Sequence, residues 1–499
     1  MPTHNNIFKL SKTKFVAGIQ CLKRLYFMCY RKDLAPPILS AQQAIFDTGT
    51  EVGRLARQLF PDGVLIDDDA LHHSDAVAKT KKLISQREVS SIFEAGFATG
   101  NVLIRTDILE RCSGRRWRLL EVKSSTKVKE ANFYDVALQS HVLKQSGIAV
   151  DAECLVHINN AYVYNGKRLD LSKFFSVEDI SQQIEKLAPS LPKLIREQQE
   201  VLSSDSAPDI GPGKHCFSPY ECEFYDHCRA SKPEHWVCDL PRIRADILTQ
   251  LAEDGIEDIR KVPGDFPLSD LQQRICRCVK SGKPFFGRGL RADLEVLETP
   301  IYFLDFETVM PAIPLYAGTH PYEAVPFQWS LHKLGRNGKL SHHEFLCDGK
   351  EDPREELLTA FIDAIGDRGS IVMYTPYEKR ILNNLTGAFP EHADAIESVV
   401  GRLFDLCAVV RDHVYHPDFG CSFSLKSVQP VLVPEMGSYE DLAVQDGLQA
   451  GISFLRMVSP GTSADEARRI RKDLLEYCGR DTLGMVKLYQ KLLTATSGA

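Results

Sequence analysis

Three charged residues in one stretch of the chain have the types and spacing needed for phosphodiester hydrolysis. Asp107 lies in the apolar run VLIRTDILE, and Glu121 and Lys123 lie two residues apart in the next run, WRLLEVKSS. Residues two apart in a strand point to the same face. Two carboxylates can hold a divalent ion that polarises a phosphate, while an ammonium positions or activates the attacking water. Ordinary charge alternation on a strand is the alternative, but unpaired carboxylates among apolar residues are costly.

A second pair of carboxylates lies in the C-terminal half of the chain. Asp305 and Glu307 are two residues apart in IYFLDFETV, so a strand places both on one face of an otherwise apolar segment. Two such carboxylates repel each other unless a cation neutralises them, which favours a metal pair. Farther along, Tyr477 and Asp481 are one helical turn apart, so the tyrosine can orient a water while the aspartate ligates metal.

Two more acids are candidates for the same C-terminal site. Glu378 lies in MYTPYEKR and Asp405 in LFDL, ahead of the basic residue Lys426. A glutamate can ligate a metal ion, but its longer side chain moves the ion. A degenerate domain that keeps the fold without catalysis is therefore the alternative for this half of the chain.

Three of the fourteen cysteines form a regular series. Cys216, Cys222 and Cys228 recur with five residues between them in HCFSPYECEFYDHC. Zinc sites favour cysteine pairs two residues apart, whereas an iron–sulfur cluster needs four thiolates and hence one more ligand. Cys21 is the best candidate for the fourth ligand, with Cys29 and Cys238 as competitors. Zinc is the alternative to iron and sulfur.

A basic track lies in the middle of the chain. Arg274, Arg277, Lys280 and Lys283 recur at every third position, and no acid interrupts the segment 274–291. On a helix this spacing gives a slowly drifting stripe that suits a phosphate backbone, although a solvated helix face has the same pattern. The preceding residues have the cadence of a helix-hairpin-helix element with an incomplete glycine signature.

These residues need a mixed α/β framework to bring them together. Helical patterns cover 11–35, 41–60, 131–146 and 176–202, Glu94 lies in another helical pattern, and strand-like runs lie at 102–110, 117–125 and 152–164. The runs IYFLDFETV, FQWSLHKL, HHEFLCD and IVMYTPYE predict a second set of strands, with helices at 377–386 and 465–493. We therefore expect two α/β domains, 1–238 and 299–499, joined by a helical linker at 239–298.

Composition limits the class of protein further. The 499 residues carry a net charge of −7 and are 43% hydrophobic, which is ordinary for a multidomain globular chain. No stretch reaches the length of a membrane span and the N-terminus lacks the apolar core of a signal peptide, so we expect a cytoplasmic protein with no membrane partner. In a reducing cytosol the cysteines are not expected to form disulfides. The charge gives no global basic field, so nucleic acid would have to bind local patches.

The first set of residues resembles a known nuclease superfamily. The order Gly49, Gly53, Glu94, Asp107, Glu121-Val122-Lys123, Gln139 is similar to the RecB-like branch of the PD-(D/E)XK nucleases, whose core is restriction-endonuclease-like. The resemblance implies that Asp107 and Glu121, together with Glu94, bind Mg2+ or Mn2+, that Lys123 is catalytic and that Gln139 supports the site. The tyrosine that often follows the glutamine is not at its usual offset, and Tyr134 and His141 are both open as replacements.

The cysteines extend this resemblance. One far-upstream cysteine and a downstream series that bracket such a core resemble the 4Fe-4S nucleases typified by the CRISPR-associated RecB-like exonucleases and the AddB nuclease domain. The resemblance implies a 4Fe-4S cluster on Cys21, Cys216, Cys222 and Cys228. Such a cluster staples the two ends of the domain together.

The C-terminal pattern resembles the DEDD, ribonuclease H-like 3′–5′ exonucleases of the tyrosine subclass, which implies two-metal hydrolysis with Tyr477 beside the ligands. The order of all the blocks resembles the bacterial family called domain of unknown function 2779, whose name supplies no substrate. We therefore expect a Mg2+- or Mn2+-dependent nuclease that acts on DNA rather than RNA, as an exonuclease on single-stranded ends, in DNA repair or defence. The alternatives are an RNA exonuclease that uses only the C-terminal domain and a non-catalytic nucleic-acid-binding protein.

Overall fold

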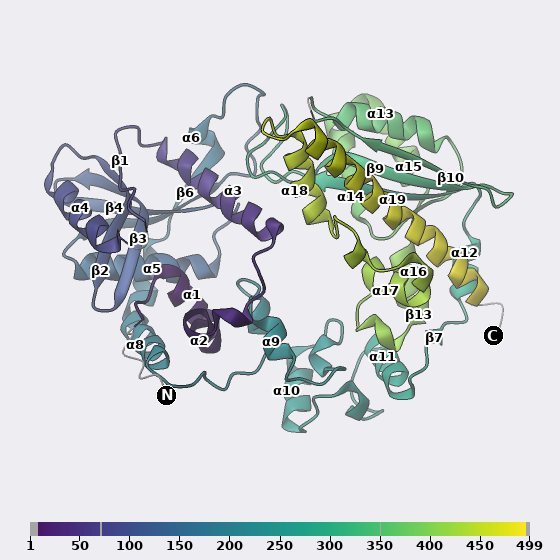
Figure 1. Ribbon diagram of the computed structural model, residues 1–499, viewed down its shortest axis with the longest axis horizontal. Coiled ribbons are helices and arrows are strands. Elements are labelled where there is room, and N and C mark those ends of the chain that lie inside the picture. The colour runs from purple at the N-terminus through teal and green to yellow at the C-terminus, as the bar shows by residue number, and fades with distance from the viewer. Residues whose placement is uncertain (1–7, 70–71, 350, 496–499) are drawn as a thin grey trace. The chain divides into compact units, whose positions relative to one another are not determined.

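The chain forms two α/β units. The computed structural model describes residues 8–69, 72–349 and 351–495 (Figure 1). Unit 1 comprises residues up to Ser231 together with the short segments Ala312–Leu315 and Thr319–Tyr322. Unit 2 comprises Lys232–Pro311, Tyr316–Gly318 and the chain from Glu323 onward. Mixed α/β structure in both halves confirms the class expected from the sequence.

Unit 1 is built on a six-stranded sheet whose strands follow one another in chain order. The strands are β1 (Val64–Leu65), β2 (Ser91–Thr99), β3 (Val102–Ser113), β4 (Arg116–Lys123), β5 (Ala149–Ile158) and β6 (Phe175–Asp179). Strands β2, β3 and β4 form an antiparallel meander, whereas β4 and β5 are parallel. Helix α5 (Glu130–Gln145) makes the crossover that parallel strands require.

Both faces of this sheet are apolar, because neighbouring residues along each strand point to opposite sides. Leu109 and Leu119 pack with α5 and with α1 (Lys12–Gln20), and Ile108 and Leu120 pack on the other face with α3 (Ser40–Arg57). The remaining α-helices of the unit are α2 (Leu22–Tyr30), α4 (His73–Ser85), α6 (Leu171–Phe174), α7 (Ser181–Leu187), α8 (Leu191–Leu202) and α9 (Tyr225–Arg229). By the same alternation, Asp107 and Glu121 point to the α5 face.

The structure corrects three local expectations in unit 1. Glu94 lies in the largely buried strand β2 and not in a helix, and its backbone φ is positive at 56°. The predicted helix 11–35 is two helices, because the backbone is extended at Cys21. The predicted helix 176–202 begins as strand β6 and continues as α7 and α8.

Unit 2 is built on a five-stranded sheet of order β10-β9-β8-β11-β12. The strands are β8 (Ile301–Val309), β9 (Val325–Leu334), β10 (Leu340–Leu346), β11 (Ile371–Met373) and β12 (Leu403–Asp405). Strand β9 is antiparallel to both β8 and β10, whereas β8, β11 and β12 are parallel to one another. The central strand of this sheet is therefore the one that carries Asp305 and Glu307.

Helices cover both faces of this sheet (Figure 1). Leu304 and Phe306 pack on one side with α13 (Arg354–Ile365), α14 (Tyr377–Ala388) and α15 (Ala393–Val400). Phe303 packs on the other side with residues of α19 (Ala464–Ala495), the long C-terminal helix. Helix α18 (Gly447–Val458) lies next to α19 over the end of β8. Since Asp305 has the alternation of Phe303, it points to the α19 face.

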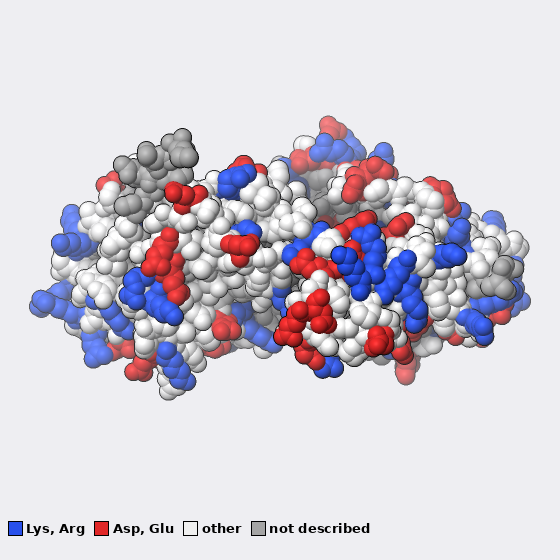
Figure 2. Space-filling model, turned by 90° about the horizontal axis from the view of Figure 1, so that it is seen from below, with Lys and Arg blue, Asp and Glu red and all other residues white. Residues whose placement is uncertain are grey.

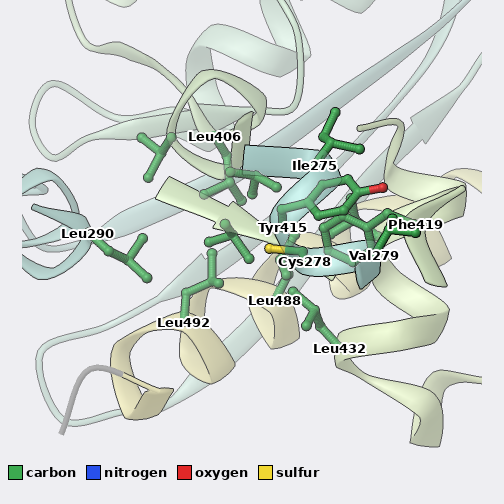
Figure 3. Packing of buried hydrophobic residues seen from close by; sticks show 14 of the residues in the cluster. Ile275, Cys278, Val279, Leu290, Leu406, Tyr415, Phe419, Leu432, Leu488 and Leu492 are labelled. Atoms are coloured by element: carbon green, nitrogen blue, oxygen red, sulfur yellow. The ribbon is translucent and has the colours of Figure 1, made fainter. Parts of the chain in front are cut away.

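The helical segment 239–298 belongs to unit 2. Its helices α10 (Ala245–Glu253), α11 (Asp270–Ser281) and α12 (Leu290–Glu295) share one hydrophobic core with α16 (Leu406–His413), α17 (Leu425–Leu432) and α19. In Figure 3, Ile275 and Val279 of α11 lie close to Tyr415 and Leu488. A two-stranded ribbon of β7 (Phe285–Phe286) and β13 (Val414–Tyr415) ties the same elements together. The segment predicted as a helical linker thus packs into the core of unit 2, while Arg277, Lys280 and Lys283 of the predicted basic track are exposed.

The described part of the chain contains no helix whose length and apolar character would let it cross a bilayer.

Candidate active sites

The predicted residues of unit 1 converge on one buried carboxylate. Glu121 of β4 is only 2% exposed. Its Oε1 accepts a hydrogen bond of 2.7 Å from Lys123, and its Oε2 accepts one of 2.8 Å from the Gln139 amide of α5. Asp107 on the neighbouring strand accepts a 2.8 Å bond from the backbone N–H of Val122. The structure therefore brings together the four residues Asp107, Glu121, Lys123 and Gln139.

Two further residues complete this site, and neither was predicted from the sequence. Lys12, the first residue of α1, donates to Glu121 Oε2 at 2.9 Å and to Asp107 Oδ1 at 3.4 Å. Asp135 of α5 accepts from Lys123 at 2.7 Å and from Gln139 at 3.0 Å. Lys12 is about a hundred residues from its partners in sequence, and only the packing of α1 on α5 brings it there. Asp135 lies one helical turn before Gln139, and that spacing is the signal that could have found it.

The charges of the unit 1 site nearly balance. Burial by itself would lower the pKa of Lys12 and of Lys123, but nearby Asp107, Glu121 and Asp135 reverse this, and both ammonium groups have a raised pKa. The site thus contains two ammonium groups and three carboxylates. Gln139 Oε1 is buried without a hydrogen-bond partner among the described residues. Carboxylate and amide oxygens are the ligands that Mg2+ and Mn2+ favour, so these residues fit a hard divalent ion.

Glu94 lies beside this group but contacts a different partner. Its two strand neighbours pair with the two neighbours of Asp107, so Glu94 and Asp107 are opposite each other on β2 and β3. The Glu94 carboxylate accepts a 2.7 Å hydrogen bond from Arg57 of α3. Its predicted role as a ligand therefore requires this ion pair to open.

Gly49 and Gly53 are both in α3, and Tyr134 and His141 are both in α5. Burial lowers the pKa of His141. Within the described part of the chain neither Tyr134 nor His141 hydrogen-bonds the carboxylates of the site, so the structure does not select between them as a replacement for the tyrosine.

The four predicted cluster cysteines gather at one end of unit 1. Cys21 lies at the junction of α1 and α2, and Cys216 and Cys222 lie in a loop that is closed by a 2.7 Å backbone bond between them. Burial raises the pKa of Cys228, and the thiols of Cys216 and Cys21 raise it further. Burial raises the pKa of Cys222 to about 11, with a contribution from Cys216. Cys216, Cys222 and Cys228 share one hydrophobic cluster, and Cys21 acts electrostatically on Cys228.

The competing cysteines have other surroundings. Cys29 packs against the core of the sheet, and Cys238 packs in the core of unit 2. By contrast, the residues around Cys21 hold the cysteine loop directly: Gln20 donates to the carbonyls of His215 and Tyr220 at 2.7 Å each, and Arg24 donates to Glu223 at 2.9 Å. These contacts favour Cys21 as the fourth ligand.

The unit 2 site collects carboxylates from three elements. Glu307 of β8, Glu378 of α14 and Asp481 of α19 are all buried, and Asp305 is partly buried. Burial raises the pKa of Asp305 and of Glu307 well above the usual range, and the neighbouring carboxylates add to the rise. Burial likewise raises the pKa of Glu378 to about 8 and that of Asp481 to about 6. Such groups repel one another unless a cation or protons neutralise them.

A thiol takes part in the same cluster. Cys478 donates to Asp305 Oδ2 at 3.4 Å, and ligand atoms of Asp305, Glu307 and Cys478 lie within 4.8 Å of one another. Cys478 was not among the residues predicted from the sequence, so it is a residue that sequence reasoning missed. Its place directly after Tyr477 in the Tyr-x3-Asp pattern was the available signal.

Asp405 lies at the edge of the cluster and has a structural task. Its Oδ1 accepts a 2.9 Å bond from the Ala408 N–H and so caps the N-terminus of α16. Its charge contributes to the raised pKa of Glu378. Glu378 Oε2 is buried without a hydrogen-bond partner among the described residues. Glu378 and Asp481 also influence each other electrostatically, so Glu378 belongs to the same group of acids.

Two tyrosines and a lysine border the unit 2 carboxylates. Tyr439 donates a 2.5 Å hydrogen bond to Asp481 Oδ1. Burial raises the pKa of Tyr477 and of Tyr439 above their usual range, and Asp481 raises both further. The ammonium of Lys426 lies 5.6 Å from the ring centre of Tyr477, and its charge lowers the pKa of Glu307 and Asp481. Burial and the charge of Asp481 therefore keep both phenol hydroxyls protonated, and Tyr439 contacts Asp481 directly.

The basic track differs from its prediction. Helix α11 ends at Ser281 and Gly282 caps it in the left-handed conformation, so Lys283 lies beyond the helix. Arg274 donates to the carbonyls of Arg411 and Asp412, and Lys280 donates to that of Val262. These side chains therefore brace the unit 2 core, and a four-residue stripe on one helix is wrong. Figure 2 likewise shows Lys and Arg interspersed with Asp and Glu over the face it draws, rather than one continuous basic surface.

The segment 247–269 also departs from a full helix-hairpin-helix. Helix α10 is followed by the single 3-10 turn Ile259–Lys261, and α11 begins only at Asp270. The second helix of the motif is therefore missing at its expected position.

Comparison with known proteins adds one finding to the two α/β units and their carboxylate clusters. The family model described as Domain of unknown function (DUF2779) matches residues 302–424. This match supports the DUF2779 family for the segment that carries Asp305, Glu307, Glu378 and Asp405. No curated protein matches the chain.

Proposed function

We propose that the protein is a metal-dependent nuclease with one hydrolytic site in each unit. The observation that carries this proposal is that each unit gathers separate acidic residues into one partly buried cluster next to a lysine or a tyrosine. Carboxylate clusters of this kind bind divalent ions, and ions so held activate water and stabilise the charge of phosphodiester cleavage. The antiparallel meander and α5 crossover of unit 1 fit a PD-(D/E)XK core, and the five-stranded sheet of unit 2 fits a ribonuclease H-like domain.

The side chains of unit 1 have distinct tasks under this proposal. Asp107 and Glu121 would hold the ion, and Lys123 lies 2.7 Å from Glu121, where its ammonium can position a water at the phosphate. Gln139 and Asp135 hold Glu121 and Lys123 from α5 and so fix their orientation. Lys12 donates to both oxygens of Glu121 and would have to give way to an ion that binds both carboxylates.

The side chains of unit 2 divide in the same way. Asp305, Glu307, Glu378 and Asp481 would hold the ions, with Asp405 at the edge. Tyr439 holds Asp481 by its hydroxyl, and Tyr477, which stays protonated, can orient a water next to Glu307. The bound ions would stabilise the charge that develops on the attacking and leaving oxygens.

We also propose that Cys21, Cys216, Cys222 and Cys228 bind a 4Fe-4S cluster. Their proximity and the contacts of Gln20 and Arg24 to the cysteine loop support it. When bound, the cluster would hold the start of unit 1 to its end. Protein purified without oxygen is expected to be brown and to contain about four irons per chain. A colourless anaerobic preparation with one zinc per chain would contradict the assignment.

The experiment for the main proposal uses the full chain and end-labelled single strands. We expect Mn2+ or Mg2+ to support degradation of single-stranded DNA faster than of RNA of the same sequence, and EDTA to abolish it. Labels at the 5′ and 3′ ends distinguish exonucleolytic from internal cleavage. Cluster-loaded protein that cuts neither DNA nor RNA with Mn2+ would overturn the proposal.

One observation favours a second candidate, an RNA exonuclease that uses unit 2 alone. The unit 1 carboxylates are already paired with Lys12 and Lys123, whereas those of unit 2 raise one another's pKa and so have the greater need of a cation. In that case the RNA strand is degraded faster than the DNA strand, and Lys123→Ala leaves the rate unchanged.

A further inference from the structure

A groove on unit 2 has no role in the sites described above. It lies between the β9–β10 edge of the sheet and the outer face of α19 and has a volume of about 840 Å³. Its lining includes two histidines, His332 and His342, and four basic residues, Arg468, Arg471, Lys472 and Arg480. The groove is wholly formed by one unit.

Two stacked imidazoles form the floor of the groove. His332 of β9 and His342 of β10 are directly paired across the two strands, and their rings lie 4.2 Å apart at 17°. His332 bonds Thr482 at 2.8 Å, and His342 bonds Ser330 at 2.8 Å, so both rings are held in place. Burial lowers the pKa of His332 to about 4 and also lowers that of His342. Both rings are therefore neutral near pH 7 and offer an aromatic face rather than a charge.

The exposed ring is the one that a ligand can reach. His332 is buried, whereas the side chain of His342 is about one third exposed. On the helix side, Gly479 faces His342: a Cβ at this position would lie 3.5 Å from the ring. That distance is ordinary van der Waals contact, so α19 packs closely against this edge of the ring, and a ligand would approach His342 from its exposed side.

Basic side chains line the wall above this floor. Arg468 and Lys472 are exposed and lie one turn apart on α19. Arg471 and Arg480 also line the groove; Arg471 donates to the Leu346 carbonyl at 2.8 Å, and Arg480 donates to the Met436 carbonyl. The acids of the lining are Glu344 and Glu476, and Arg468 also pairs with Asp465. Four cations against two lining acids leave the groove positively charged.

The groove is connected to the unit 2 carboxylates through α19. The guanidinium of Arg480 lies 5.7 Å from the ring centre of Tyr439, whose hydroxyl donates to Asp481. Residues 477, 478 and 481 thus face the carboxylates, while 479 and 480 face the groove within the same turn.

We propose that this groove binds a single nucleic-acid strand, with one base stacked on His342 and the phosphates of its neighbours on Arg468 and Lys472. Neutral aromatic rings beside mobile cations are the combination by which proteins hold single strands without reading their sequence. The proposal rests on the proposed nuclease function for its class of ligand. It adds a binding site that lies outside the hydrolytic centre of unit 2.

The test measures binding in the absence of cleavage. Fluorescence anisotropy of labelled twenty-residue dT and rU strands is recorded with the full chain in EDTA, over a series of salt concentrations. The double variant Arg468→Ala/Lys472→Ala is expected to bind about tenfold more weakly, and its salt slope should fall by about 1.4 because two phosphate contacts are lost. His342→Ala is expected to lose about fivefold to tenfold, and His342→Phe, which keeps an aromatic face, should recover most of it.

A matched control separates the groove from general charge. Arg469→Ala/Lys339→Ala removes two exposed cations, one from α19 and one from the β9–β10 connection, that do not line the groove. This control should bind like the parent chain. Thermal melts of all variants establish that each is folded. Equal loss in the groove and control variants, or no loss in either, would overturn the proposal.

Parallel cleavage assays in Mn2+ keep this test distinct from that of the proposed function. If the groove variants bind weakly and the parent chain cuts nothing, the strand-binding groove is supported and the nuclease function is contradicted. If the groove variants bind strands normally and the parent chain is an active nuclease, the strand-binding groove is contradicted and the nuclease function is supported. Preference for dT over rU, or the opposite, identifies the kind of strand.

Discussion

The two acidic clusters of this protein are neutralised in different ways. In unit 1, Lys12 and Lys123 contact Glu121 directly, and the pKa of both lysines is raised. In unit 2, Glu307 and Asp481 have the charge of Lys426 nearby, but their pKa values remain raised. Unit 1 therefore carries its own counterions, whereas unit 2 depends on protons or on a bound cation. Two sites with the same proposed chemistry can therefore differ in how their carboxylates are neutralised when no metal is bound.

The largest expected effect is an opposite response to removing one charge in each unit. Glu121→Gln leaves two partly buried lysines with fewer partners, so we expect it to destabilise metal-free unit 1 by about 2–3 kcal/mol. Glu307→Gln removes a buried charge that has no such partner, so metal-free unit 2 should be as stable or more stable. Thermal melts in EDTA check this. Equal destabilisation by both variants would break the comparison.

The next effect is a pH dependence confined to unit 2. The pKa of Glu378 is raised to about 8 in the folded state, above its ordinary value of 4.5. Between these values the folded state binds more protons than the unfolded state, so stability falls as pH rises from about 5 to about 8. We expect Tm in EDTA to drop over this range, and to drop less in Glu378→Gln or with saturating Mn2+. A flat profile in the parent chain would contradict the raised pKa.

A smaller effect concerns the lysine that reaches unit 1 from α1. Because Lys12 already neutralises Glu121 and Asp107, Lys12→Ala should strengthen Mn2+ binding at unit 1 by about fivefold to tenfold, equivalent to roughly 1 kcal/mol. Electron paramagnetic resonance of free Mn2+ measures this, in a Glu307→Gln background that weakens the other site. Lys14→Ala on the same helix is the control. Weaker binding in Lys12→Ala would show that the lysine supports the ion rather than competing with it.

The smallest expected effect tests Asp405. As the N-cap of α16 it should contribute about 1 kcal/mol, so Asp405→Ala lowers Tm by a few degrees and Asp405→Ser, which restores a cap, lowers it less. Mn2+ affinity should then fall only slightly in both. A large and equal loss of Mn2+ affinity in Ala and Ser variants would instead make Asp405 a ligand.

Local patterns predicted most of the framework. Strand alternation correctly placed Glu121 with Lys123 and Asp305 with Glu307, because two-residue periodicity decides which face a side chain takes. It failed where a local signal was absent: Glu94 lies in a strand, and the extended backbone at Cys21 splits the first helix in two. The spacing of basic residues from Arg274 predicted a stripe on one helix, but Gly282 ends that helix before Lys283. Arg274 and Lys280 also donate hydrogen bonds to backbone carbonyls.

Long-range partners were the part that sequence could not supply. Lys12 meets Glu121 across 109 positions, and Tyr439 meets Asp481 across 42, through the packing of whole helices. His332 and His342 are likewise paired by strand register and give no motif. The match to Domain of unknown function (DUF2779) covers residues 302–424, so it does not extend to Lys426, Tyr439 or Asp481.

The central claim is that both acidic clusters are metal-dependent hydrolytic sites, and single-strand cleavage by matched variants tests it most directly. The rates for the parent chain, Lys123→Ala, Asp305→Asn and the double variant are compared in Mn2+ on one end-labelled DNA strand. We predict that each single variant loses part of the activity and that the double variant loses at least about 100-fold. A double variant that cuts as fast as the parent chain would contradict the account.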